Sequence, residues 1–299
     1  MADPFVIETV DLRKRYDGVE ALQGLNLQVP AGSIFGFLGR NGAGKTTTMK
    51  ILLGMTRPTS GRARVFGLTP GSSGEGVDIR RRAAFVSEDK SLYDSMDVAA
   101  MVRFTASLFP RWRADLERQY LRAFELPPHA SIKTLSRGMR TKLALLLALC
   151  RGADLLILDE PTSGLDPAVT EQVLQALVAH VADAPATVFF SSHQIADVDQ
   201  IADHVAIIDR GRTAVSGALD DLRRDYRRIQ LVFDDTAPEA VFTAPGVMHV
   251  RRSGRVLTLL STAGAGQVVE QARALAPASI DVCPVSLKEI FLETVNAEE

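Results

Sequence analysis

Apolar residues along the first two thirds of the chain follow two alternating patterns, one typical of strands and one typical of helices. Residues 5–12 and 23–29 alternate apolar with polar positions, which predicts strands that bury one face. Continuous apolar runs predict buried strands at 33–38 (SIFGFL), 83–87 (AAFVS), 154–160 (DLLILDE), 186–193 (ATVFFSSH) and 204–212 (HVAIIDRGR). Segments with helical periodicity, such as residues 169–181, separate several of these strands, so the pattern predicts an α/β fold.

Two regions depart from this alternation and indicate the domain organisation. Between Asp97 and Cys150 the helical period dominates, with a break at Pro127–Pro128, which predicts a helical subdomain at about residues 92–150. After an arginine-rich segment, short strands are predicted at 228–233, 247–252 and 255–260, and helices at 265–275 and 286–294. We therefore expect a first domain over residues 1–222 and a small α+β domain over residues 223–299.

The composition is that of an ordinary globular protein and excludes several classes. Of the 299 residues 46% are hydrophobic and 23% charged, and a net charge of −2 gives no basic field for nucleic acid. Cys150 and Cys283 lie far apart, which favours a reducing compartment without a disulfide framework. The N-terminus begins polar and is unlike a signal peptide, and the longest apolar run, at 143–150, is too short to span a bilayer.

The segment from Gly39 to Thr46 fits the pattern G-x-x-x-x-G-K-[ST], between a predicted strand and a predicted helix. Its glycines let backbone N–H groups surround an anion, and the helix N-terminus adds positive potential. Lys45 is expected to reach the β- and γ-phosphates of ATP, and the Thr46 hydroxyl to bind Mg²⁺. A glycine turn without a ligand is the alternative, and the strand and helix on either side disfavour it. The expected ATP-binding residues of this loop are Gly39, Arg40, Asn41, Gly42, Ala43, Gly44, Lys45, Thr46 and Thr47.

Two acids and a histidine end the next two buried strands and supply candidate catalytic groups. Asp159 can hold Mg²⁺, directly or through water, and Glu160 is placed to polarise a water for attack on the γ-phosphate. His193 could hydrogen-bond the γ-phosphate and hold Glu160. Alone, such residues are more often solvated acids and a structural histidine, but a phosphate loop beside them favours catalysis.

With these residues in place, the chain resembles the ATP-binding subunits of ABC transporters over about residues 5–220. LLILDEPTSGLDP at 155–167 is similar to the Walker B segment and D-loop of that family, and SSH at 191–193 to its switch histidine. The resemblance implies a P-loop NTPase cassette, with a mixed sheet core plus a helical subdomain, followed here by the small α+β domain. It also implies an ATPase with ATP and Mg²⁺ as cofactors.

The resemblance extends to three further segments. RYDGVEAL at 15–22 is similar to the aromatic A-loop, which would put Tyr16 on the adenine, although core packing is the alternative for a lone tyrosine. LSRGM at 135–139 occupies the signature position, usually LSGGQ, and implies that Ser136 and Gly138 contact the γ-phosphate bound by a second ATP-binding subunit. A homodimer is the expected arrangement, although the sequence leaves a heterodimer open. Asp166 of the D-loop would link the two sites.

Three positions depart from the family pattern. In the signature, Arg137 replaces a glycine and Met139 replaces a glutamine. We expect the signature site to remain functional, with Arg137 adding charge at its edge. The alternative is a signature whose function is impaired. Glu88 stands where the Q-loop has glutamine. Its carboxylate can serve Mg²⁺ or its water, and its charge beside phosphates should sharpen the need for Mg²⁺.

FPRW at 109–112 and SLKEIFLETV at 286–295 resemble bacterial exporter ATPases that work with ABC-2-type permeases. This implies a multi-spanning membrane permease as partner, contacted through the face around residues 88–110. The protein would then be peripheral, at the cytoplasmic face of the cell membrane, and would power export of an unidentified small molecule or lipid-like compound.

The alternative is a soluble ABC-type ATPase that acts on ribosomes or nucleic acid. Such proteins carry paired cassettes, coiled coils or basic arms, which the sequence lacks, so no nucleic-acid partner is expected. A P-loop kinase or GTPase has no reason to carry LSRGM together with SGLD.

Overall fold

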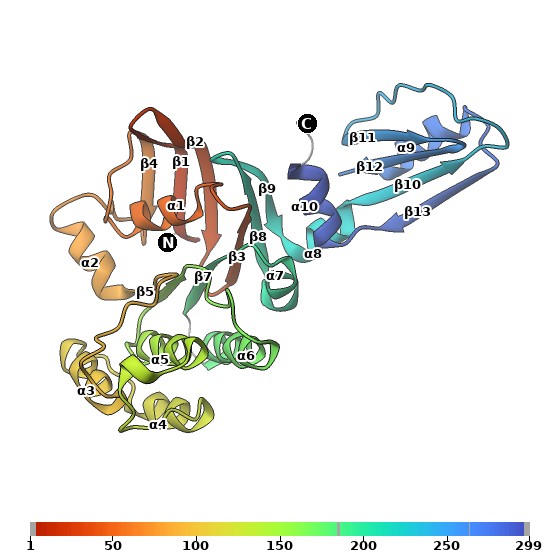
Figure 1. The fold of residues 1–299 in the computed structure, drawn as a ribbon. Helices are drawn as coiled ribbons and strands as arrows, with labels where there is room; N and C mark the ends of the chain where they lie inside the picture. The colour runs from red at the N-terminus through yellow and green to blue at the C-terminus, as the bar shows by residue number, and fades with distance from the viewer. Residues whose placement is uncertain (1–3, 184–185, 263, 296–299) are drawn as a thin grey trace. The chain divides into compact units, whose positions relative to one another are not determined.

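A six-stranded sheet, parallel through five of its strands, carries the predicted phosphate loop. It is seen in a computed structural model that describes residues 4–183, 186–262 and 264–295. The strand order in this sheet is β5 (Ala83–Val86), β6 (Leu155–Leu158), β7 (Thr187–Ser192), β3 (Ile34–Gly39), β8 (His204–Asp209) and β9 (Arg212–Ala218) (Figure 1). The continuous apolar runs of the sequence are therefore confirmed as strands of a buried parallel sheet.

The centre of this sheet is buried on both faces. Every residue of β3 and of β7 is buried, and β3 pairs in parallel with β7 and with β8. The ring of Phe189 lies 5.7 Å from that of Phe35 and 5.1 Å from that of Phe37, contacts worth about 0.5–1.5 kcal/mol each beyond the area they bury. This packing fixes the height at which β3, β6 and β7 end, and so the positions of the loops that follow them.

A second, antiparallel sheet is formed by the N-terminal hairpin and one later strand. Its order is β2 (Val19–Pro30), β1 (Phe5–Tyr16) and β4 (Ser60–Val65), and α1 (Lys45–Leu52) contacts strands of both sheets. The hairpin strands are longer than predicted because the chain continues pairing through polar residues up to the turn. The sequence did not predict β4, since only Ala63 and Val65 of that strand are buried. Between β4 and β5 the chain forms α2 (Glu75–Arg82).

Helices fill the region predicted to be helical. They are α3 (Val98–Leu108), α4 (Ala114–Ala123), the 3-10 helix η1 (Ile132–Thr134) and α5 (Arg137–Leu149), and α6 (Pro167–Asp183) packs against α5. The predicted break at Pro127–Pro128 lies between α4 and η1. Asp97 caps α3 by accepting a hydrogen bond from the Ala100 amide at 2.6 Å.

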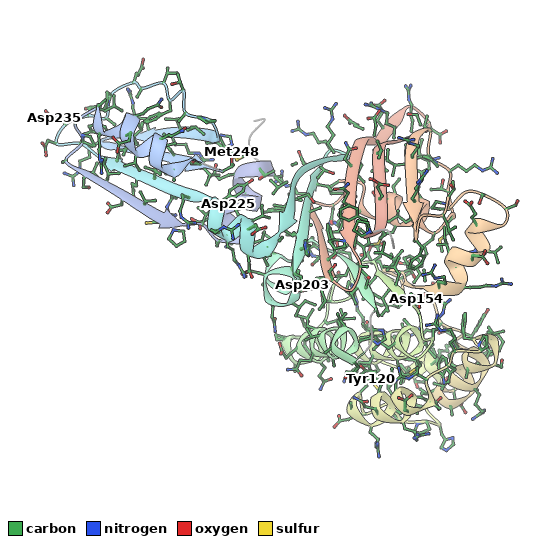
Figure 2. All side chains as sticks on the ribbon, turned by 180° about the vertical axis from the view of Figure 1, so that it is seen from behind. Tyr120, Asp154, Asp203, Asp225, Asp235 and Met248 are labelled. Atoms are coloured by element: carbon green, nitrogen blue, oxygen red, sulfur yellow. The ribbon has the colours of Figure 1, made fainter. Side chains whose placement is uncertain are left out.

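Asp154 ties the entrance of β6 to two arginines from other segments. Its Oδ2 accepts a hydrogen bond of 2.7 Å from Arg82 at the end of α2, and its Oδ1 accepts one of 2.9 Å from Arg111. Asp154 itself is labelled in Figure 2. The two guanidinium groups lower the pKa of Asp154 even though partial burial alone would raise it. One carboxylate thus joins α2, the loop before α4 and the sheet.

Residues 217–295 form a second unit. The division falls between Ser216 and Gly217, and the boundary at 222/223 stays a prediction. The unit contains α8 (Leu219–Asp225) and an antiparallel sheet of order β11 (Val247–Ser253), β12 (Val256–Ser261), β10 (Arg227–Val232) and β13 (Ser279–Pro284). Helices α9 (Ala265–Arg273) and α10 (Leu287–Val295) complete it, and Val268 of α9 packs in its core with Ile229 and Leu259.

The strands β10, β11 and β12 and the helices α9 and α10 were predicted, and α8 was not. The sequence did not predict β13, because its side chains are not buried in alternation. Between β7 and β8 the chain forms α7 (Ile195–Ile201). Among the residues that the structure describes, no helix is long and apolar enough to cross a membrane. Residues 1–3, part of the N-terminal segment considered for a signal peptide, lie outside the described residues.

The two cysteines should differ in reactivity because their environments differ. Burial raises the pKa of the Cys150 thiol to about 12, and Cys283 is partly exposed. A thiol-alkylating reagent near neutral pH should therefore modify only Cys283 in the native protein and both thiols after denaturation. Intact-protein mass spectrometry measures this, and Cys283→Ala, which should remain unmodified while native, is the control. Modification of native Cys150 as fast as Cys283 would contradict the packing described.

Candidate functional site

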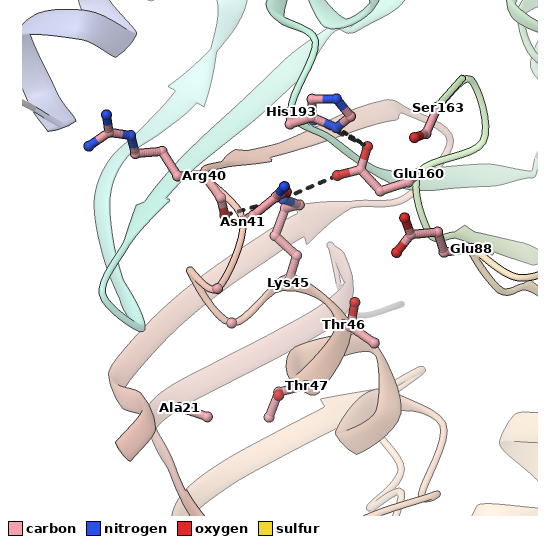
Figure 3. A pocket seen from close by; sticks show the side chains of 12 residues that line it. Ala21, Arg40, Asn41, Lys45, Thr46, Thr47, Glu88, Glu160, Ser163 and His193 are labelled. Carbon is pink, nitrogen blue, oxygen red and sulfur yellow. Dashed lines mark hydrogen bonds and ion pairs between the residues drawn. The ribbon is translucent and has the colours of Figure 1, made fainter. Parts of the chain in front are cut away.

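The loops that follow β3, β6 and β7 meet at one edge of the parallel sheet and enclose a polar cavity of about 480 Å³ (Figure 3). These strands are adjacent, so their carboxyl ends bring side chains distant in sequence together. The residues that line the cavity are Ala21, Arg40, Asn41, Gly42, Gly44, Lys45, Thr46, Thr47, Glu88, Glu160, Ser163 and His193. Most of the predicted phosphate loop, Glu88, Glu160 and His193 therefore share one cavity.

The glycines of the loop are required by its backbone. Gly42 and Gly44 have φ angles of 84° and 106°, in the left-handed region that other residues rarely adopt. A Cβ atom on Gly44 would also lie 2.7 Å from the carbonyl oxygen of Ala21. Gly44 caps α1, whose first turn contains no acidic residue, so the positive end of the helix dipole faces the cavity unneutralised by its own helix.

Lys45 is buried, and its ammonium group is held by both the loop and Glu160. Its Nζ donates to the carbonyl oxygen of Gly39 at 2.8 Å and to that of Arg40 at 3.4 Å. It also lies 3.1 Å from Oε1 of Glu160, an ion pair whose two side chains are only 7% and 6% exposed. The cavity thus contains a buried positive charge, at the place where a phosphate loop needs one.

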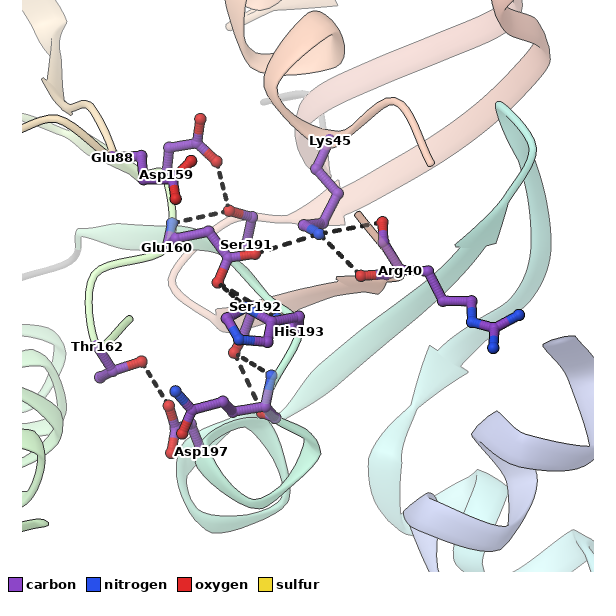
Figure 4. Close-up of polar contacts among 12 residues, drawn as sticks. Arg40, Lys45, Glu88, Asp159, Glu160, Thr162, Ser191, Ser192, His193 and Asp197 are labelled. Carbon is purple, nitrogen blue, oxygen red and sulfur yellow. Dashed lines mark hydrogen bonds and ion pairs between the residues drawn. The ribbon is translucent and has the colours of Figure 1, made fainter. Parts of the chain in front are cut away.

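Asp159 is held by two hydroxyl groups, and Figure 4 shows the contact with that of Ser191. Thr46 donates to its Oδ2 and Ser191 to its Oδ1, both at 2.7 Å. The Ser191 hydroxyl also accepts the backbone N–H of Glu160 at 2.9 Å, so one serine orients both acids. Asp159 lies behind the cavity wall and is only 1% exposed, which leaves its carboxylate few orientations.

Glu160 has a left-handed backbone and a carboxylate fixed at both oxygens. Its φ angle is 49°, a conformation that costs a residue other than glycine about 1–3 kcal/mol. Oε2 lies 2.7 Å from Nδ1 of His193 and accepts the His193 backbone N–H at 3.3 Å. Oε1 forms the ion pair with Lys45 but has no hydrogen-bond partner among the described residues. That oxygen is buried against the ammonium group of Lys45.

The protein supplies two converging oxygens for a metal ion, one from Thr46 and one from Asp159. No group of three or more His, Cys, Asp or Glu side chains that could hold a metal occurs among the residues described. A hydroxyl and a carboxylate suit a hard cation that takes its other ligands from phosphate oxygens and water. Glu88 lines the same cavity and adds a third oxygen donor nearby.

Seven predicted residues do not line the cavity, and three of them lie directly behind it, Gly39 and Ala43 in the loop and Asp159. Tyr16 lies near the end of β1, 41% exposed, with Nζ of Lys14 at 4.6 Å from its ring centroid. Ser136 caps α5 by accepting the Met139 amide at 3.2 Å, and Asp166 accepts the Val169 amide at 3.0 Å in the first turn of α6. Gly138 lies in the first turn of α5. Roles for the last three in nucleotide contact need a second copy of the chain.

Arg137, the departure in the signature, lies against the D-loop of its own chain. A Cβ atom on Gly164 would be 2.5 Å from Nη1 of Arg137, so the guanidinium covers the backbone of that glycine. Gly164 has a φ angle of 68° and accommodates this contact because it lacks a side chain.

The sequence did not indicate four residues that line or support the site. Ser191 belongs to the SSH segment, but nothing in that segment indicates that this serine binds both acids. Ser163 and Ala21 line the cavity without a chemical signal of their own. A fourth residue, Lys90, donates to the carbonyl oxygen of Glu160 at 3.1 Å, although a lysine in the segment SEDKS is typical of a solvated loop.

Comparisons with known proteins agree with this geometry. The sequence profile of the family described as "ABC transporter" matches residues 22–163. The chain is 38% identical over 223 residues to the daunorubicin/doxorubicin resistance ATP-binding protein of Streptomyces peucetius. That alignment covers 73% of this chain and 66% of the other protein. It is 33% identical over 225 residues to the bacitracin transport ATP-binding protein of Bacillus licheniformis. That alignment covers 75% of this chain and 73% of the other protein.

A solved structure of the ATP-binding subunit of an ABC transporter superposes with a TM-score of 0.66 at 29% identity. The superposition covers 73% of this chain and 92% of the other.

The hydroxyl of Ser191 should contribute measurably to stability, because Ser191→Ala leaves a buried carboxylate oxygen and a buried amide without their partner. We expect the free energy of unfolding to fall by about 1–3 kcal/mol, measured by denaturant titration. Ser163→Ala is the matched control, since no hydrogen bond of that hydroxyl is seen among the described residues, and it should change stability by less than about 0.5 kcal/mol. Equal stability of the two variants would contradict the role given to Ser191.

Proposed function

The chain belongs to the family of ABC transporter ATP-binding subunits, which hydrolyse ATP, and from this premise we propose that it powers export of a small molecule through a separate membrane-spanning partner. The observation that carries the proposal is the convergence of the phosphate loop, Asp159, Glu160 and His193 on one polar cavity. The names of two similar proteins refer to daunorubicin/doxorubicin resistance and to bacitracin transport, which supports a small molecule as cargo.

The residues of the phosphate loop would bind ATP through their backbone amides. Gly42 and Gly44 keep the loop open to an anion, and Lys45 supplies the charge that faces the β- and γ-phosphates. Thr46 and Asp159 would hold Mg²⁺, with Glu88 contacting it or its water. Bound Mg²⁺ neutralises charge on the phosphate oxygens. The exposed ring of Tyr16 is available to stack on the adenine.

Glu160 would accept a proton from the attacking water. Its carboxylate is fixed by His193 on one oxygen and by Lys45 on the other, so its orientation is defined before the reaction starts. His193 would hold Glu160 and donate to the γ-phosphate. Catalysis of this kind consists of positioning and charge stabilisation.

Two copies of the cassette would close on two nucleotides. Ser136 and Gly138 stand at the N-terminus of α5, outside the cavity of their own chain, where backbone N–H groups can face an anion on another molecule. Asp166 begins α6 and would link the two sites through the D-loop. A homodimer satisfies these requirements with one kind of chain.

A groove beside the site offers a place for the membrane partner. A cavity of about 200 Å³ lies between β5 and helices α3 and α5, and its lining includes Leu92 and Phe109. Three large apolar side chains near it are unusually exposed, Tyr93 by 56%, Phe104 by 39% and Leu108 by 57%. Exposed apolar groups of this size support docking of a protein segment and do not favour a nucleic acid or ribosome as the partner. The protein would thus act as a peripheral subunit at the cytoplasmic face of the membrane.

The proposal is tested by capturing the partner. Glu160→Gln should bind ATP but hydrolyse it at a rate reduced by about 100-fold or more, because the general base is lost. The variant should therefore stay in the closed, ATP-bound dimer. With ATP it should capture one multi-spanning membrane protein in stoichiometric yield from solubilised membranes, identified by mass spectrometry. Lys45→Ala, which lacks the phosphate-binding charge, should not show this ATP dependence. Recovery of ribosomes or DNA-bound factors would favour the soluble ATPase instead.

The carboxylate of Glu88 should make ATP binding more dependent on Mg²⁺. Its negative charge beside the phosphates opposes binding of ATP without the metal, so Glu88→Gln should reduce the Mg²⁺-dependent gain in ATP affinity by about fivefold, or about 1 kcal/mol. Equilibrium binding of a fluorescent ATP analogue with and without Mg²⁺ measures this. If the ATP affinity of wild type and that of Glu88→Gln are each unchanged by Mg²⁺, the role proposed for Glu88 is contradicted.

A further inference from the structure

Lys90 is a buried lysine whose ammonium group joins two segments of the site by their backbones. Its side chain is only 5% exposed, and Nζ donates to the carbonyl oxygen of Glu160 at 3.1 Å and to that of Glu88 at 3.0 Å. No carboxylate forms an ion pair with it within the described part of the chain. Its contacts are therefore directed at the backbone, where Glu160 has its left-handed conformation.

This arrangement has a cost that a purely structural residue would avoid. Burial, and next the charge of Arg137, lower the pKa of Lys90, and the nearby acids Glu88, Asp159 and Glu160 only partly offset them. An apolar side chain of similar length would fill the same space without that penalty. Lys90 itself has a φ angle of 46°, so two strained residues, Lys90 and Glu160, are joined by this one hydrogen bond.

The position of Lys90 also connects two surfaces of the protein. Lys90 and its neighbours Ser87 and Ser91 line the groove of about 200 Å³ described above, whereas the carboxylate of Glu160 lines the nucleotide cavity. Four residues further on, Asp94 forms an ion pair of 2.5 Å with Arg140 of α5. The segment 87–94 is thus fastened to the Glu160 backbone at one point and to α5 at another.

We propose that Lys90 is a positioning residue for Glu160, which keeps the carboxylate at its place between Lys45 and His193 only while the segment 87–94 stays in position beside the groove. The inference rests on the proposed role of Glu160 as the base in ATP hydrolysis. Displacement of the segment by an occupant of the groove would pull on the Glu160 carbonyl through a single side chain, and so change the rate of hydrolysis without changing the phosphate loop.

The test compares Lys90→Met, which keeps the length of the side chain but removes the donor, with four other variants of the full chain. Lys142→Met is the matched control, because Lys142 is also buried, 7% exposed, and donates to a backbone carbonyl, that of Phe124 at 3.4 Å, away from the site. Lys90→Met should lower kcat about 10- to 100-fold, as loss of residues that orient a reacting group does, and Lys90→Arg should recover part of that loss.

KM for ATP in Lys90→Met and kcat in Lys142→Met should stay within about threefold of wild type. In single-turnover assays with radiolabelled ATP, Lys90→Met added to Glu160→Gln should cause no further loss, because its effect acts through the carboxylate. An additive loss, or a fall in kcat matched by Lys142→Met, would overturn the inference.

The outcomes separate this inference from the function it rests on. If Glu160→Gln is impaired and Lys90→Met is not, the inference fails and the proposed function stands. If Glu160→Gln hydrolyses ATP normally, the role of Glu160 fails, and the inference with it. A crystal structure of Lys90→Met gives a readout independent of turnover. The Glu160 φ should leave the left-handed region and Oε2 should move away from Nδ1 of His193, and an unchanged Glu160 would overturn the proposal.

Discussion

Parallel pairing of β6, β7 and β3 is the constraint on which the rest of the structure depends. In a parallel sheet the carboxyl ends of neighbouring strands lie at one edge, so three segments distant in sequence deliver Lys45, Glu160 and His193 to one place. Burial of β3 and β7 on both faces fixes this register, because a shift of one residue would move apolar side chains out of the core. Site geometry is thus a product of core packing.

The two acids of the site are held by hydroxyls and by contacts to their backbone as much as by opposite charges. Asp159 is fixed by two hydroxyls, the Glu160 amide by Ser191, and the Glu160 carbonyl by Lys90. Buried carboxylates need such partners, because desolvation otherwise favours their protonated form. The same contacts remove rotational freedom in advance, so the acids do not have to be ordered during each reaction cycle.

The sequence predicted the buried strands and the phosphate loop because their signals are local. A continuous apolar run or a glycine pattern can be recognised without knowing what lies beside it, and the Asp-Glu pair follows such a run directly. The strands β4 and β13 were missed because they lie at sheet edges and bury few side chains. Ser191 and Lys90 were missed as site residues because their partners are backbone and carboxylate groups distant in sequence, which no pattern within one segment reveals.

The buried pair of Lys45 and Glu160 makes ligand binding at this site an exchange of anions. Any phosphate that approaches the ammonium group competes with a carboxylate already 3.1 Å away, so a simple monovalent anion gains little by entering. A ligand with several charges can contact the loop amides and the ammonium group at once and exceed what it displaces. The pair therefore favours anions that make several contacts at once over monovalent anions such as chloride.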